Sequence, residues 1–132
     1  METILDEGEL QHLSGLIVHE MYQVYFKYGP GIFEKVYEAA LAGRLRRAGL
    51  RVERQKTIAI TDDFVHNEPA FVADLVVEGH VIVEIKSVEK LSPVAFKQLR
   101  SYLRLTGLTL GLLVNFNTNF LKSSIHRVAN NY

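Results

Sequence analysis

The chain has no cysteine, and this absence excludes disulfide bonds, thiolate metal sites and cysteine nucleophiles. It also lacks an unbroken apolar run of about 18 residues, the length that a membrane-spanning helix needs. Four acids, Glu2, Asp6, Glu7 and Glu9, precede any apolar stretch, whereas a signal peptide starts with basic residues followed by an apolar segment. These absences lead us to expect a cytoplasmic protein with no membrane association.

Neither sign of charge is in excess, because 15 Lys and Arg residues balance 15 Asp and Glu residues among the 132. Such a balance differs from the strongly basic composition of a protein that coats nucleic acid. The basic residues are nonetheless clustered, and either solvated helix faces or local contacts to phosphates explain the clusters. The candidates for phosphate contact are Arg44, Arg47, Arg51, Lys97, Arg100 and Arg104.

The length of the chain fits one domain, and its apolar spacing predicts an α/β fold. Helices are expected over about 10–28 and 32–48, and a third begins at Ser92-Pro93 and ends before Gly107. The order α-α-β-β-β-α-β predicts a mixed sheet flanked by helices, with a right-handed parallel crossover in its second half. The expected strands are 52–60, 71–77, 81–86 and 109–116.

Two acids lie inside strand-like segments whose other residues are apolar. Asp74 is surrounded by Phe71-Val-Ala and Leu-Val-Val77, and Glu84 by Val81-Ile-Val and Ile85. A buried carboxylate is costly unless it is paired, hydrogen-bonded or bound to a cation. Lys86 follows Glu84 by two residues and therefore shares its face of the strand. We interpret Asp74, Glu84 and Lys86 as a candidate catalytic site, and a Glu84–Lys86 ion pair at a sheet edge is the alternative.

A third acid, Glu34, is expected to point inward from the second helix. On a helical wheel it falls with Tyr37, Leu41, Leu45 and Ala48, the stripe that should face the core. A glutamate that only stabilises the amino end of the helix through the helix dipole is the alternative.

Gln98 and Tyr102 lie four residues apart in the third predicted helix, on the same side as its apolar residues. A glutamine in such a stripe is either a hydrogen-bonded core residue or part of a site. The pair alone does not decide between the two.

The combination of these residues is more specific than any one of them. Asp74…Glu84-Ile-Lys86 on a hairpin, after a helical Glu34 and before Gln98-Leu-Arg-Ser-Tyr102, resembles the PD-(D/E)XK nuclease superfamily. The Q-x-x-x-Y spacing looks like its recombination-exonuclease branch. Gly31-Ile-Phe-Glu34-Lys-Val-Tyr37 is similar to the bacterial GxxExxY family within that superfamily, and the similarity continues over 71–78, 83–86 and 112–116. Ala73 stands where the motif name has proline.

The resemblance implies a restriction-endonuclease-like domain over residues 1–132 that hydrolyses phosphodiester bonds with the help of a metal ion. Asp74 and Glu84, together with the Ile85 carbonyl and Glu34, would hold Mg²⁺ or Mn²⁺, hard cations that prefer oxygen ligands. The expected partner is nucleic acid, which we take to be DNA although the residues do not distinguish it from RNA. A homodimer is left open.

The other candidate residues have roles outside the metal shell. Lys86 would orient or activate the attacking water or neutralise the transition state, and Gln98 and Tyr102 would position the strand or the scissile phosphate. Two alternatives stay open: a catalytically silent nucleic-acid-binding or regulatory module that keeps the nuclease fold, and a metal hydrolase that acts on small molecules.

Strand parity gives a test of this interpretation. Asp74 and Glu84 share a face only if the turn near Glu78-Gly79-His80 has an odd number of residues, or an even number with a compensating bulge. We therefore predict such a turn, with both carboxylates facing the helix that carries Glu34.

Overall fold

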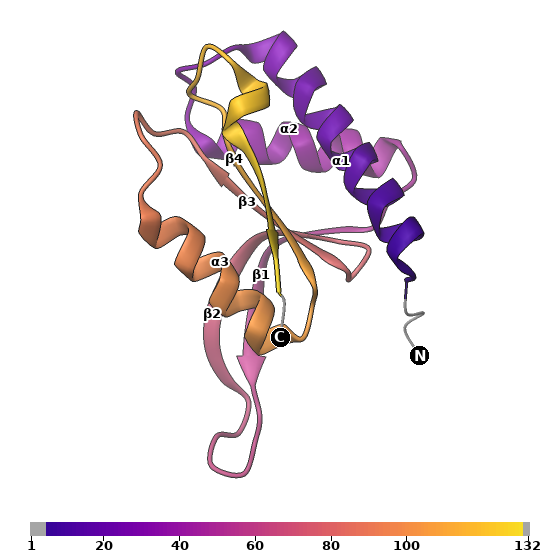
Figure 1. Cartoon of the computed structure of the whole chain (residues 1–132), viewed down its shortest axis with the longest axis vertical. Helices are drawn as coiled ribbons and strands as arrows, with labels where there is room; N and C mark the ends of the chain where they lie inside the picture. The colour runs from indigo at the N-terminus through magenta and orange to yellow at the C-terminus, as the bar shows by residue number, and fades with distance from the viewer. Residues whose placement is uncertain (1–4, 131–132) are drawn as a thin grey trace.

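A five-stranded mixed sheet forms the centre of the computed structural model, which describes residues 5–130 (Figure 1). The strands follow one another across the sheet in chain order. β3 and β4 are parallel and the other neighbours antiparallel, so the predicted parallel pair and mixed sheet are confirmed. The strands are β1 (Val52–Ile60), β2 (Glu68–Val77), β3 (Val81–Lys86), β4 (Leu110–Asn115) and β5 (Ile125–Ala129).

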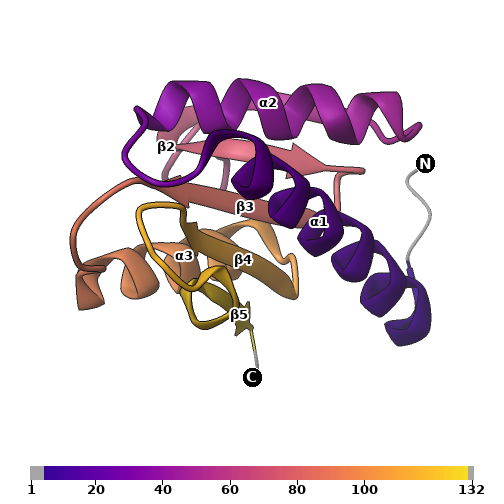
Figure 2. The ribbon, with the colours of Figure 1, turned by 90° about the horizontal axis from the view of Figure 1, so that it is seen from above.

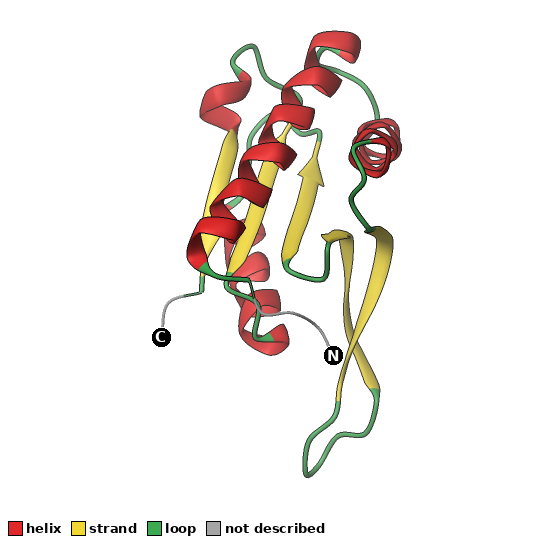
Figure 3. Cartoon of the chain, turned by 90° about the vertical axis from the view of Figure 1, so that its right-hand side faces the viewer, coloured by secondary structure: helices red, strands yellow, loops and turns green. Residues whose placement is uncertain are grey.

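Helices cover both faces of the sheet. α1 (Glu7–Tyr28) and α2 (Glu34–Arg47) lie against one face, and α3 (Pro93–Thr106) lies against the other (Figures 2 and 3). A short 3₁₀ helix, η1 (Leu121–Ser124), precedes β5. The sheet is therefore the middle of three layers, and its two faces pack against different helices.

The face beneath α1 and α2 carries the larger apolar core. Tyr37 and Phe116 are fully buried there and stack with their ring centroids 4.5 Å apart. The Tyr37 hydroxyl also donates to the Gly29 carbonyl and accepts from the Ile32 amide, which fixes the loop that leads into α2. This hydrogen bonding explains why a tyrosine can be fully buried at that position.

α3 approaches the other face closely because β4 carries a glycine at the contact. A Cβ atom on Gly111 would lie 2.8 Å from Leu99 Cδ1, closer than carbon atoms normally approach. Leu99 and Leu103 are fully buried in this second cluster, together with Ile82 and Leu113 of the sheet. α3 begins at the Ser92 cap, whose side chain accepts from the Val94 amide, and ends at Gly107, as predicted.

Several elements differ from the sequence prediction. β2 begins at Glu68 rather than at Phe71, and α2 begins at Glu34 rather than at Ile32, while β4 is one residue shorter at each end. α1 begins at Glu7 rather than near Leu10, because Asp6 and Glu9 form a reciprocal capping box that satisfies the first amides of the helix. β5 was not predicted, so the observed order is α-α-β-β-β-α-β-β. The ends of the predicted domain, residues 1–4 and 131–132, lie outside the described residues.

Candidate active site

The β2–β3 turn brings Asp74 and Glu84 together. Val77 pairs with Val81, which leaves the three-residue turn Glu78-Gly79-His80. Glu78 and Gly79 both have positive φ, at 53° and 69°, and the His80 amide donates to the Val77 carbonyl. The prediction of an odd turn is confirmed.

The ladder ends with Leu75 opposite Val83, so Asp74 and Glu84 are the next residues of their strands, and the two residues are in contact. The Asp74 amide donates to Glu84 Oε2 at 3.3 Å, and the Ile85 amide donates to Asp74 Oδ2 at 2.8 Å. β3 is the middle strand of the sheet, so Glu84 does not lie at a sheet edge as the ion-pair alternative required. No ion pair among the described residues joins Glu84 to Lys86.

The two carboxylates face α3, which corrects the expectation that they face the helix carrying Glu34. A depression of about 110 Å³ joins them to Lys86 and to the side of α3 that carries Gln98 and Tyr102. On β3 the physical reason is parity: Ile82, two residues before Glu84, packs in the α3 cluster, whereas Val83 and Ile85 pack under α1 and α2. β2 does not alternate regularly beside Asp74, because both Ala73 and Val76 pack in the α3 cluster. The face that carries the carboxylates thus also carries the smaller core.

Glu84 is the most strongly perturbed acid of the site. It is buried, with 8% of its surface exposed, and burial raises its pKa to about 9. The neighbouring Asp74 contributes to this rise through a hydrogen bond and through like charge, while the Asp74 amide and Lys86 act in the opposite direction. Without a nearby cation Glu84 is therefore protonated at neutral pH, and a cation would favour its ionised form.

The oxygen atoms that Asp74, Glu84 and their neighbours offer as ligands suit a hard divalent cation. Asp74 and Glu84 supply carboxylate oxygens, and a cation between them would offset the repulsion that arises when both are ionised. Since the amide and the carbonyl of a strand residue project to the same side, the Ile85 carbonyl also points toward the Asp74 side. The described residues contain no cluster of three or more acids or histidines that could hold a metal, so water would have to complete the shell, as it commonly does for Mg²⁺.

The two α3 candidates differ in their surroundings. Tyr102 stacks on Phe71, with centroids 3.7 Å apart and planes at 5°, which fixes its ring over the depression. Burial, followed by the charges of Glu84 and Asp74, raises the pKa of Tyr102, so its hydroxyl remains a hydrogen-bond donor. Gln98 lines the same depression and is exposed, so of the two roles left open by the sequence it does not have that of a core residue.

Glu34 does not point into the core as expected. It is exposed and lines a different depression, together with Ser87 and Asn117. Helical periodicity gave the direction around the α2 axis correctly for Tyr37 and Leu41, which are fully buried. Glu34, however, is the first residue of α2, and the buried residues of this helix begin only at Tyr37.

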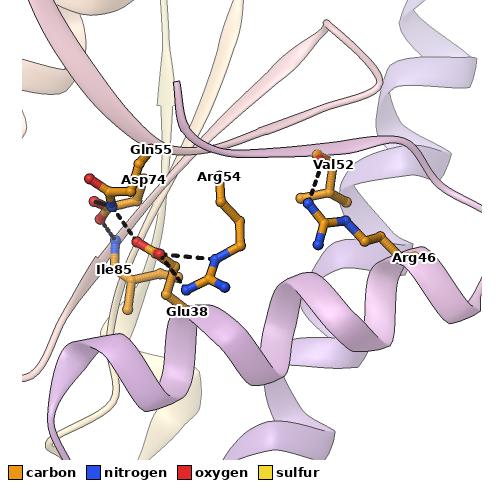
Figure 4. Close-up of polar contacts among 7 residues, drawn as sticks. All are labelled: Glu38, Arg46, Val52, Arg54, Gln55, Asp74 and Ile85. Carbon is orange, nitrogen blue, oxygen red and sulfur yellow. Dashed lines mark hydrogen bonds and ion pairs between the residues drawn. The ribbon is translucent and has the colours of Figure 1, made fainter. Parts of the chain in front are cut away.

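The inward carboxylate of α2 is Glu38, one turn later, which sequence reasoning missed. It is 3% exposed and accepts two hydrogen bonds from Arg54, at 3.1 and 3.0 Å (Figure 4). Gln55 donates both to Glu38 and to Asp74, at 2.5 and 3.3 Å. Glu38 is thus linked to the site through one side chain. Its place beside Tyr37 and Leu41 on the same stripe was the available signal.

The predicted phosphate contacts fall into two groups. Arg44 and Arg51 have carboxylate partners, with Nε–Oε distances of 2.6 Å to Glu20 and 3.5 Å to Glu78. Arg47 and the α3 residues Lys97, Arg100 and Arg104 are exposed. Because successive residues of a helix are rotated by about 100° around its axis, these three α3 residues lie on the side of the helix away from Gln98 and Tyr102.

Comparison with known proteins identifies a family for most of the chain. The family profile described as the PD-(D/E)XK nuclease superfamily matches residues 11–128. No curated protein and no solved structure matches the chain. Within residues 5–130, no helix combines the length and the apolar character that crossing a bilayer requires. The GxxExxY subfamily, the cytoplasmic location and the homodimer stay predictions.

Proposed function

The chain belongs to the PD-(D/E)XK nuclease superfamily, and on that premise we propose that it cleaves phosphodiester bonds in DNA with a divalent cation, Mg²⁺ or Mn²⁺. The observation that carries the proposal is the convergence of Asp74, Glu84 and Lys86 in one depression on the α3 face. None of these three residues belongs to either apolar core cluster.

Asp74, Glu84 and the Ile85 carbonyl are the groups that would hold the cation. When bound, it would lower the pKa of a coordinated water and offset charge on the phosphate. The Ile85 amide fixes one oxygen of Asp74 by a hydrogen bond, so that carboxylate is oriented before any ligand arrives. Glu34, which is exposed and lines another depression, is a weaker candidate for this shell than Glu38.

Lys86 supplies the positive charge of the site. Among the ion pairs of residues 5–130 none includes it, so its ammonium group is available for the substrate. There it would donate to a phosphate oxygen or to the attacking water and stabilise the charge that develops in the transition state. The Tyr102 hydroxyl, whose raised pKa keeps it protonated, and the exposed amide of Gln98 would position the strand from the α3 side.

The proposal is tested by incubating the protein with labelled single- and double-stranded DNA and RNA in Mg²⁺, Mn²⁺ or EDTA. We expect cleavage of DNA that requires the cation and that Asp74→Ala abolishes. Asp63→Ala, at an exposed aspartate between β1 and β2, is the matched control and should cleave like the wild type. Binding of nucleic acid without cleavage in every condition would instead support a catalytically silent module. Cleavage of RNA alone would contradict the proposal that DNA is the substrate.

A further inference from the structure

β1 is irregular at Gln55, directly beside the candidate site. Gln55 has φ of +49°, a left-handed conformation that a residue with a Cβ adopts at a cost in free energy. The β1–β2 ladder pairs Arg54 with Leu75 and Lys56 with Ala73, but Gln55 and Asp74 between them form no ladder pair. The irregularity therefore occurs at the one position of β1 that lies across from Asp74.

The left-handed residue changes which way two successive side chains point. In a regular strand consecutive side chains project to opposite faces. Here Arg54 and Gln55 both reach the same carboxylate, that of Glu38 on α2 (Figure 4). Since Gln55 itself is exposed, burial of its side chain does not explain why this conformation is kept. The contacts of its amide group offer an explanation.

The Gln55 amide nitrogen connects a buried anchor to a candidate metal ligand. Arg54 holds Glu38 with two hydrogen bonds, and Glu38 in turn accepts from Gln55 Nε2. The same nitrogen donates to Asp74 Oδ1, while Asp74 Oδ2 accepts from the Ile85 amide. Both oxygens of Asp74 thus have a donor, one from β3 and one from the α2-anchored glutamine.

From these contacts we infer that Gln55 is a positioning residue for Asp74, an inference that rests on the proposed function. A neutral amide suits this role, because it donates a hydrogen to two carboxylates without cancelling the charge that attracts a cation. A lysine would neutralise Asp74, and an ionised glutamate would repel it. The left-handed backbone is the means by which Gln55 reaches both acids.

Gln55→Gly separates positioning from structure. Glycine relieves the left-handed strain, so the melting temperature should stay the same or rise, while the link to Asp74 is lost. We expect weaker Mn²⁺ binding in titration calorimetry and a lower kcat, each by about tenfold or more, as for other residues that orient metal ligands. The KM for DNA should be unchanged. Gln55→Met keeps the size of the side chain without its donors and should show the same losses.

Asn67→Gly is the matched control, because Asn67 also has φ of +49° but lies directly before β2, seven residues before Asp74. It should leave Mn²⁺ affinity and kcat at their wild-type values. The inference is overturned if both Gln55 variants bind Mn²⁺ and cleave like the wild type, or if their losses only follow a lower melting temperature. If the wild-type protein itself neither binds Mn²⁺ nor cleaves, the proposed function fails first, and the inference fails with it.

Discussion

Against one face of the sheet, α1 and α2 bury a large apolar cluster, whereas on the other face α3 covers a smaller cluster that gives way to polar residues. The first face includes the fully buried Tyr37 and Phe116 and accounts for most of the core. The second holds Leu99 and Leu103, and the depression with Asp74 beside them. The difference indicates that one face supplies most of the stability and leaves the other free to carry charged groups that burial would otherwise penalise.

We expect the largest effect of a single substitution on activity at Lys86, on the face of the sheet that α3 covers. Lys86→Met removes the ammonium group and keeps much of the side-chain volume, so cleavage should fall by about 100-fold or more. Mn²⁺ affinity should hardly change, because an ammonium group does not bind a cation. Single-turnover cleavage and calorimetry measure the two quantities. Residual cleavage together with a much lower melting temperature would instead assign Lys86 a structural role.

The opposite result is expected for a residue on the apolar face. Leu41 of α2 is fully buried, and Leu41→Ala should lower the free energy of unfolding by about 2–5 kcal/mol through lost burial and a cavity. The kcat of the folded fraction should remain close to that of the wild type. Urea unfolding followed by cleavage assays at low temperature tests this. A kcat that falls as far as in the Lys86 variant would contradict the assignment of stability to one face and of activity to the other.

A smaller effect should appear in the pH dependence of stability without metal. The pKa of Glu84 is about 9 in the folded protein, against the ordinary value of 4.5 for a glutamate in an unfolded chain. Between these values the folded state holds a proton that the unfolded state releases, so stability falls as the pH rises from about 4.5 to 9.

Glu84→Gln removes that ionisation. In EDTA, its melting temperature should exceed that of the wild type by several degrees at pH 8, and the difference should shrink toward pH 5. Thermal unfolding at a series of pH values measures it. Parallel curves for the two proteins would show that burial of Glu84 does not govern its protonation.

The smallest effect concerns the exposed basic residues of α3. If Lys97, Arg100 and Arg104 contact phosphates, replacing them with glutamine should weaken DNA binding and flatten its dependence on salt, for all sequences alike. Since they lie on the side of α3 away from Tyr102, kcat at saturating DNA should be unchanged. Fluorescence anisotropy across a salt series tests this. An unchanged slope would leave these residues as an ordinary solvated helix face.

The sequence predicted much of the fold because its signals there are local. The bounds of β1 and β3 were predicted to the residue, and the Ser92 cap and Gly107 correctly marked the ends of α3. β5 was missed because it is a short edge strand in which only Val128 is buried. Its mixed polar and apolar residues carry no clear period-2 pattern.

The site was predictable only where strand parity applies. Parity required an odd β2–β3 turn, or an even one with a compensating bulge, for Asp74 and Glu84 to share a face, but it could not tell which helix covers that face. Helical periodicity shows which side of α2 faces the core, but not at which turn of the helix the buried residues begin. It therefore pointed to the exposed Glu34 and not to the buried Glu38, one turn later. Gln55 could not be found from the sequence, because its role depends on a left-handed backbone and on a contact with α2.

The central claim, that Asp74 and Glu84 form one cation site on the α3 face, is tested most directly by calorimetric titration with Mn²⁺. Wild-type protein and the control Asp63→Ala should bind, whereas Asp74→Ala and Glu84→Ala should show no measurable binding. Because Glu84 is protonated in the metal-free protein, binding at pH 7 should release a proton, and the heat should vary with the ionisation enthalpy of the buffer. Equal Mn²⁺ affinity in all four proteins would contradict the account.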